Sequence, residues 1–386
     1  MGGPQATRRN SVVLIASPHA GHGAEMNELV TELRTAGIKV GAWLSVEALD
    51  AAAAQGVLWR RAGHSAAIAA GGDGTVGAVA SHLAGSDLAL GILPVGTSND
   101  IARSLGIPLQ RERAIATIAA GEALTIDAGQ VIPAMTEPHA MRWRQRLRAL
   151  IPGGPAPLTG AYFLHTVTLG FNVRFAELAT DVERRERLGA LNYATALLET
   201  LTQMEPIETT IHFTGVHTAE GMLDSLDVQT RALQIAAINT PVFGGGFNLH
   251  VPDVSARDDL LDFIVIEPFD PSLIAEVAQA LLGALGNLGA RLFGQESQPP
   301  AIPGLQRYQA RSARIETPTP LDATLDGEIR ARTPMLIRIA PEKLRIYLPT
   351  EARAALLEEE RQEEAQEEAQ EESNPDAIPK EAERGV

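Results

Sequence analysis

The sequence of 386 residues is long enough for two domains and a large hydrophobic core. It contains no cysteine, which excludes disulfides and thiolate metal sites, and its formal net charge of −16 argues against a general nucleic-acid binder. Residues 351–386 carry a net charge of −9, which leaves −7 on residues 1–350. No apolar run is long and continuous enough to span a bilayer, and the short run after Arg9 indicates a strand rather than a signal peptide. We therefore expect a cytoplasmic protein that meets any lipid peripherally.

Short apolar runs and amphipathic helical patterns alternate over residues 1–131. Strands are predicted at residues 11–16, 38–44, 66–70, 88–93 and 124–131, with helices between them. Such alternation predicts an α/β domain, in which a parallel sheet is covered by helices on both faces.

Two polar loops follow neighbouring strands of this domain. The first, Gly71-Gly72-Asp73-Gly74-Thr75, opens a helix, and its glycines let another group approach the backbone. Consecutive N–H groups at a helix start favour anions such as phosphate, and a carboxylate among them argues for a bridging cation. The second loop, residues 94–100, reads Pro-Val-Gly-Thr-Ser-Asn-Asp. Both loops are expected at the same sheet edge.

Residues 132–161 form a predicted insertion with a basic amphipathic segment. Apolar side chains of Ala140–Ile151, including Trp143, share one helical face, and four arginines spread over the rest: Arg142, Arg144, Arg146 and Arg148. Such a helix can lie on an anionic membrane surface or pack on the protein with its arginines in water. The residues alone leave both alternatives open.

The pattern changes to closely spaced strand candidates over residues 162–349. Turns separate them, and two helical patterns interrupt them, near residues 187–203 and 272–293. This predicts a mainly antiparallel, sandwich-like β domain. Residues 350–386, rich in glutamate, are expected to form a solvated helix that fades into disorder.

A resemblance to a known family rests on several of these residues. The Gly71–Thr75 loop, the 94–100 loop, the Leu105-Gly106-Ile107-Pro108 run and Asp326-Gly327-Glu328 resemble the diacylglycerol kinase and sphingosine kinase family. The resemblance spans roughly residues 10–350 and implies an ATP-dependent, magnesium-assisted lipid kinase. It also implies that the active site lies in the cleft between the two domains. Its expected substrate is a lipid hydroxyl, on diacylglycerol or on a sphingoid base, ceramide or phospholipid, and a homodimer stays open.

The resemblance also implies roles for individual residues. Glu328 is the expected general base and Asp73 a second catalytic residue. Magnesium is expected at Asp73, Asp258 and Leu260. Nucleotide contacts are expected at Ser17, Pro18, Gly21, Ser45, Gly71, Gly72, Asp73, Gly74, Thr75, Thr97 and Asn99. A lysine-containing P-loop is absent, because none of the three lysines follows a glycine, and Asn99 can equally be a helix cap.

Five positions depart from the family pattern: Ser17, Ala78, His165, Arg257 and Asp259. The last replaces a glycine and is expected to alter the turn of the Asp258 loop. Two alternative functions follow. One is an enzyme similar to NAD kinase, which shares the Gly71–Thr75 motif, and the other is a catalytically weak nucleotide- or lipid-binding regulator.

Overall fold

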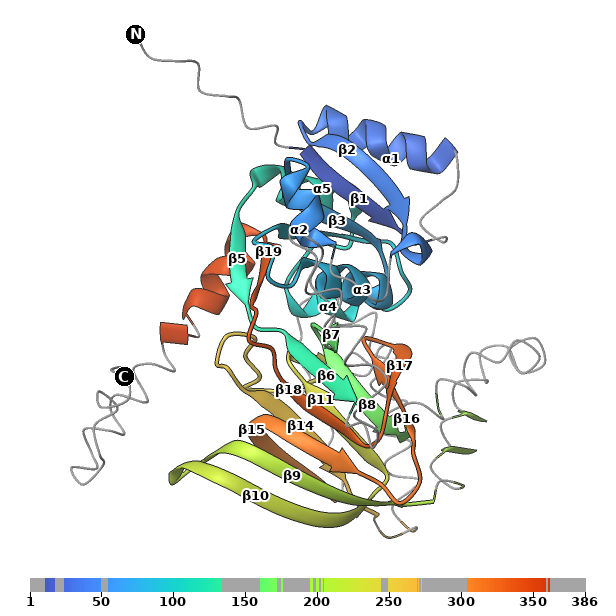
Figure 1. Ribbon diagram of the computed structural model, residues 1–386, viewed down its shortest axis with the longest axis vertical. Helices are drawn as coiled ribbons and strands as arrows, with labels where there is room; N and C mark the ends of the chain where they lie inside the picture. The colour runs from blue at the N-terminus through green and yellow to red at the C-terminus, as the bar shows by residue number, and fades with distance from the viewer. Residues whose placement is uncertain are drawn as a thin grey trace, which may run out of the picture.

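The computed structural model describes most of the two predicted domains (Figure 1). Described are residues 11–17, 24–49, 55–133, 160–171, 205–243, 249–268 and 304–358, with positions 175, 195–196, 199–200, 203, 270, 272 and 360–361. Several predictions lie outside these ranges: the nucleotide contacts Pro18 and Gly21, the basic segment 140–151, most of the helices near 187–203 and 272–293, and the tail beyond residue 361.

The first domain is built on a six-stranded sheet in the order β2-β1-β3-β4-β19-β5. Its strands are β1 (Ser11–Ala16), β2 (Lys39–Ser45), β3 (His64–Gly71), β4 (Ala89–Pro94), β5 (Ala123–Ile126) and β19 (Leu344–Tyr347). All neighbours run parallel except β5 and β19. Every residue of β1 and β4 is buried, as expected for strands that are covered on both faces.

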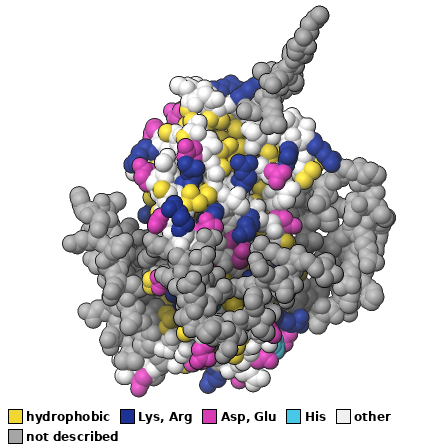
Figure 2. All heavy atoms as spheres, turned by 90° about the vertical axis from the view of Figure 1, so that its left-hand side faces the viewer, with side chains coloured by type: hydrophobic (Ala, Val, Ile, Leu, Met, Phe, Trp, Pro, Cys, Tyr) yellow, Lys and Arg dark blue, Asp and Glu magenta, His cyan; other side chains and the backbone are white. Residues whose placement is uncertain are grey.

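Short helices cover this sheet. They are α1 (Ala24–Thr35), α2 (Gly56–Arg61), α3 (Asp73–Leu83), α4 (Asp100–Ser104) and α5 (Arg111–Ala120), with a 3-10 turn, η2, at Val46–Ala48. On the face shown in Figure 2, positive and negative side chains of this domain are interspersed rather than gathered by sign. The predicted parallel α/β domain is confirmed.

The second domain is an eleven-stranded antiparallel sheet with the path β17-β16-β8-β11-β14-β15-β18-β6-β7, to which β9 and β10 are added through β15. Its strands are β6 (Gly129–Pro133), β7 (Ala161–Phe163), β8 (Thr166–Gly170), β9 (Ile207–Thr218), β10 (Gly221–Ala232), β11 (Gln234–Ile238), β14 (Leu261–Ile266), β15 (Leu305–Glu316), β16 (Asp322–Leu325), β17 (Glu328–Arg332) and β18 (Met335–Ile339). A separate pair joins β12 (Val242–Phe243) to β13 (Leu249–His250). Phe213 and Phe263 meet edge to face in the core of the second domain, with ring centroids 5.2 Å apart. The predicted antiparallel β domain is also confirmed.

The chain crosses between the two sheets twice, which the order of the predicted elements does not reveal. The single strand predicted over residues 124–131 is divided into β5 in the first sheet and β6 in the second. The strand near residues 344–348, expected within the β domain, instead returns as β19 between β4 and β5. The apolar alternation of Leu344 and Ile346 is the same in either sheet, so only the pairing distinguishes the two placements.

The helices α3 and α4 lie at the junction of the two domains (Figure 1). Ser81 on α3 accepts a hydrogen bond at its Oγ from the backbone N–H of Tyr162 on β7, at 3.2 Å. The C-terminal half of α3 therefore contacts the β domain. No helix in the described part of the chain is long and apolar enough to cross a membrane.

Candidate active site

Residues predicted to contact nucleotide gather where parallel strands of the first sheet end. Ala16 of β1 is in register with Ser45 on β2 and with Ala70 on β3, and Gly71 is in register with Pro94 on β4. Ser17 donates its backbone N–H to the Ala70 carbonyl at 3.0 Å. Ligands of open α/β sheets bind at this carboxyl edge, so the described members of the predicted set share one location.

The loop from β3 to α3 is tightly folded. Gly72 is the N-cap of α3, and a Cβ on Gly71 would overlap the side chain of Thr75. Asp73, Gly74 and Thr75 form the first turn of the helix. The backbone N–H groups of a first helical turn have no partner inside the helix, so this loop offers donors to an anion.

The second loop lies directly against the first. A Cβ on Gly96 would overlap the α carbon of Gly72, so the backbones approach each other more closely than any other residue type allows. Asn99 has a left-handed backbone with φ of 52°. Its Oδ1 accepts the N–H of Gly96 at 3.0 Å, and its Nδ2 donates to the Gly96 carbonyl at 2.8 Å. Asn99 thus shapes this loop, while Thr97 is exposed.

Asp73 joins the two loops. Its Oδ1 accepts the backbone N–H of Ile101 at 2.9 Å, in the first turn of α4. Asn99 stands at the N-cap of α4 but makes no capping bond there, so Asp73 supplies the cap from the neighbouring loop. Burial raises the pKa of Asp73, and backbone N–H donors, Ile101 first, act against that shift. This capping contact is not visible in the sequence.

The hairpin of β16 and β17 packs on the same end of α3. A Cβ on Gly74 would overlap the carboxylate of Glu328, and a Cβ on Gly77 would overlap that of Asp326. Glycines three residues apart leave one side of the helix bare, and both carboxylates occupy it. The structure therefore places Glu328, predicted as the general base, over the first turn of α3. Its side chain is 57% exposed and open to a substrate.

Asp326 fixes the position of this hairpin. It is buried, with φ of 47°, and its carboxylate accepts backbone N–H groups of Leu164, His165 and Thr166 at 3.0–3.1 Å. Burial raises the pKa of Asp326 to about 6, although Arg330 and these donors oppose the shift. The turn that carries Glu328 is thus anchored to the strand β8.

His165, one of the departures from the family pattern, is buried at the domain junction. Its Nδ1 lies 2.8 Å from the Thr240 hydroxyl, and its Nε2 lies 4.0 Å from the carboxylate of Asp100. Burial lowers the pKa of His165 to about 3, so the imidazole is neutral at physiological pH.

The acidic loop that includes Asp258 and Leu260 lies in a different set of contacts. Asp258 Oδ1 accepts the N–H of Leu260 at 3.0 Å. Asp259 keeps the left-handed backbone that a glycine would take, with φ of 59°, and its carboxylate lies 3.0 Å from Lys343 Nζ. Lys343 also pairs with the fully buried Asp127 at 2.8 Å. Asp259 thus adopts a backbone conformation that favours glycine.

The carboxylates of the two loops differ in how well they suit a magnesium ion. The described residues contain no group of three or more His, Asp or Glu side chains that could hold a metal ion. Mg²⁺ often uses one or two carboxylates together with substrate phosphates, and Asp73 in the first turn of α3 suits that mode. At the Asp258 loop, Lys343 already provides a cation to Asp127 and Asp259. The assignment of Asp258 and Leu260 to magnesium stays a prediction.

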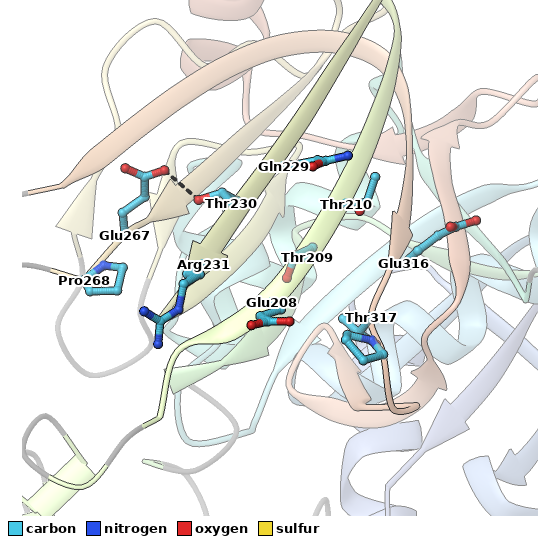
Figure 3. Close-up of a pocket in the computed structure, with 11 residues that line it drawn as sticks. Glu208, Thr209, Thr210, Gln229, Thr230, Arg231, Glu267, Pro268, Glu316 and Thr317 are labelled. Carbon is cyan, nitrogen blue, oxygen red and sulfur yellow. Dashed lines mark hydrogen bonds between the residues drawn. The ribbon is translucent and has the colours of Figure 1, made fainter.

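A hollow of about 870 Å³ lies elsewhere, on the β domain (Figure 3). Glu208, Glu267 and Glu316 line it with one arginine, Arg231, and the Thr230 hydroxyl donates to Glu267 at 2.6 Å. Three carboxylates against one guanidinium disfavour a phosphate, so this hollow is not a second candidate for the nucleotide.

Comparisons with known proteins agree with the division into these two domains. Residues 11–131 match the diacylglycerol kinase catalytic domain, and residues 165–348 match the YegS C-terminal NAD kinase beta sandwich-like domain. A "Probable lipid kinase YegS-like" of Pseudomonas aeruginosa is 29% identical over 301 residues, which cover 77% of this chain and 80% of that protein. A "Probable lipid kinase YegS" of Escherichia fergusonii is 27% identical over 343 residues, which cover 88% and 96%.

A solved structure shares the fold. It is a diacylglycerol kinase from Bacillus anthracis, with a TM-score of 0.54 and 17% identity over 90% of this chain and all of that one.

Proposed function

This chain belongs to the lipid kinase family that joins a diacylglycerol kinase catalytic domain to a YegS-type C-terminal domain, and we propose that it transfers the γ-phosphate of ATP to the hydroxyl of diacylglycerol or a related lipid. The observation that carries the proposal is the contact between Gly74 and Glu328. It brings an exposed carboxylate from one domain to the anion-binding turn of the other. Phosphoryl transfer needs these two parts side by side.

The nucleotide phosphates bind at the start of α3 in this proposal. The N–H groups of the Gly71–Thr75 loop donate to them, and the absence of side chains at Gly72 and Gly96 lets the second loop lie directly against the first. Asp73 would hold a magnesium ion together with the phosphates. Such an ion neutralises the charge that develops on the transferred group.

Glu328 acts on the lipid. Its carboxylate accepts the proton of the lipid hydroxyl while the oxygen bonds to the γ-phosphorus and the bond to the β–γ bridging oxygen breaks. ADP leaves with that oxygen. The anchored Asp326 turn limits where Glu328 can lie, which favours attack from one direction.

The proposal is tested with labelled ATP and a panel of acceptors. Diacylglycerol, a sphingoid base, ceramide and a phospholipid are compared with NAD, each with the full chain and Mg²⁺. Label in a lipid extract supports the proposal. Label in NAD, or ATP binding without transfer to any acceptor, would favour the two alternatives instead.

A further inference from the structure

Arg330 lies at an irregularity of the β16–β17 hairpin. Thr324 pairs with Ile329 and Ala323 pairs with Ala331, so the register passes over Arg330. An extra residue of this kind is a β-bulge, which redirects a side chain. Here the guanidinium Nη2 is directed at α3, 2.9 Å from where a Cβ on Gly77 would lie.

The contacts of Arg330 lie within the same hairpin, with the Leu325 carbonyl and with Glu328. Its Nη2 donates to the Leu325 carbonyl at 3.2 Å, and its Nε lies 3.8 Å from Glu328 Oε2. That Nε is buried and has no hydrogen-bond partner among the residues described. The Arg330 side chain is only 21% exposed, against 57% for Glu328. A guanidinium held this way is fixed by the fold rather than free in water.

The charges at this place need such a cation. The hairpin brings Asp326 and Glu328 to a turn that is suited to anions. Two carboxylates next to the phosphates of a nucleotide would repel them, and the low dielectric of a buried site increases that repulsion. Arg330 supplies the opposite charge within the same hairpin.

We propose that Arg330 is a positioning residue for phosphoryl transfer. It keeps the Glu328 carboxylate over Gly74, and it offsets the two carboxylates so that nucleotide phosphates can bind beside them. The inference rests on the proposed kinase function and adds a residue to that site.

The test compares Arg330→Met and Arg330→Lys with a matched control, Arg332→Met, in the full chain. Arg332 is on the same strand, is 63% exposed and pairs with Asp322 at 3.0 Å. With a short-chain diacylglycerol in detergent and Mg-ATP, we expect Arg330→Met to lower kcat by about tenfold or more, and to raise the Kd of Mg-ATP. Arg330→Lys should recover part of both losses, and Arg332→Met should resemble the parent.

A chemical rescue separates positioning from support of the fold. Guanidinium ion added at subdenaturing concentration should restore part of the kcat of Arg330→Ala, whereas urea at the same concentration should not. Parent values of kcat and Kd in a folded Arg330→Met would overturn the inference, as would a loss of melting temperature with unchanged kcat and no rescue. If the parent phosphorylates no lipid, the proposed function fails, and an unchanged Kd of Mg-ATP in Arg330→Met then overturns this inference as well.

Discussion

Gly74 is a residue at which the two domains meet in the candidate site. Its missing Cβ leaves the space that the Glu328 carboxylate occupies. The obstacle to a larger residue is the far end of a flexible, exposed side chain, which can move away at little cost in stability. A larger residue at position 74 is therefore compatible with folding but displaces the carboxylate that the proposed chemistry requires.

Gly74→Ala should accordingly lower kcat by about tenfold or more, because it displaces Glu328, while the melting temperature changes little. Kinetics of the single variants and of Gly74→Ala with Glu328→Gln measure this. If the effect passes through Glu328, the double variant is no slower than Glu328→Gln alone. Multiplied losses in the double variant would contradict that explanation.

The helix α4 depends on a carboxylate from another element. Asp73 at the start of α3 caps it through Ile101, in addition to any role toward a cation. Asp73→Ala removes both functions and should cost about 1 kcal/mol of unfolding free energy, the usual value of a cap. Its turnover should fall on the order of 10³-fold if the carboxylate serves the transferred phosphate.

Asp73→Asn distinguishes the two functions, because an amide oxygen can still accept the Ile101 N–H but carries no charge. Denaturant unfolding should place Asp73→Asn near the parent and Asp73→Ala below it. Both variants should lose turnover. Parent-like turnover of Asp73→Asn would remove the carboxylate from the mechanism.

At the scale of the whole molecule, two crossings join the domains, and an ion pair between Asp127 and Lys343 links the two crossings. Asp127 lies between β5 and β6, and Lys343 lies between β18 and β19. Burial raises the pKa of Asp127, and its bond to Lys343 opposes that shift. The ion pair therefore matters most when Asp127 is charged.

Lys343→Met should lower the unfolding free energy by about 2 kcal/mol at pH 7, a value below that of a fully buried pair because the lysine side chain is 41% exposed. Without Lys343, the pKa of Asp127 in the folded state is raised further. The free energy of unfolding of the variant therefore falls as pH rises above the pKa of Asp127 in the unfolded state, which is near 4. The loss should therefore shrink as pH falls from 7 to about 3, where Asp127 is largely protonated in both the folded and the unfolded state. Urea unfolding at the two pH values checks this, and equal losses at both would contradict it.

The architecture is predictable from the sequence where buried strands are uninterrupted apolar runs. β1 and β4 are apolar throughout because both faces are covered, and the two loops after β3 and β4 were recognisable from their glycines. The sequence predicts β19 in the wrong sheet, because the residues of a four-residue strand do not indicate which strands pair with it. The proposed base was found from the Asp-Gly-Glu motif, but the cap on α4 and the bulge at Arg330 depend on contacts between distant residues. No local pattern encodes those contacts.

The central claim is that Glu328 takes the proton of a lipid hydroxyl during transfer from ATP. Its most direct test compares Glu328→Gln with the parent, and with Glu208→Gln as a control in the distant hollow of the β domain. If Glu328 is the base, we expect Glu328→Gln to lower kcat for lipid phosphorylation by about 10²-fold or more, while the Kd of Mg-ATP stays near that of the parent. Unchanged kcat, or a loss confined to ATP binding, would contradict it.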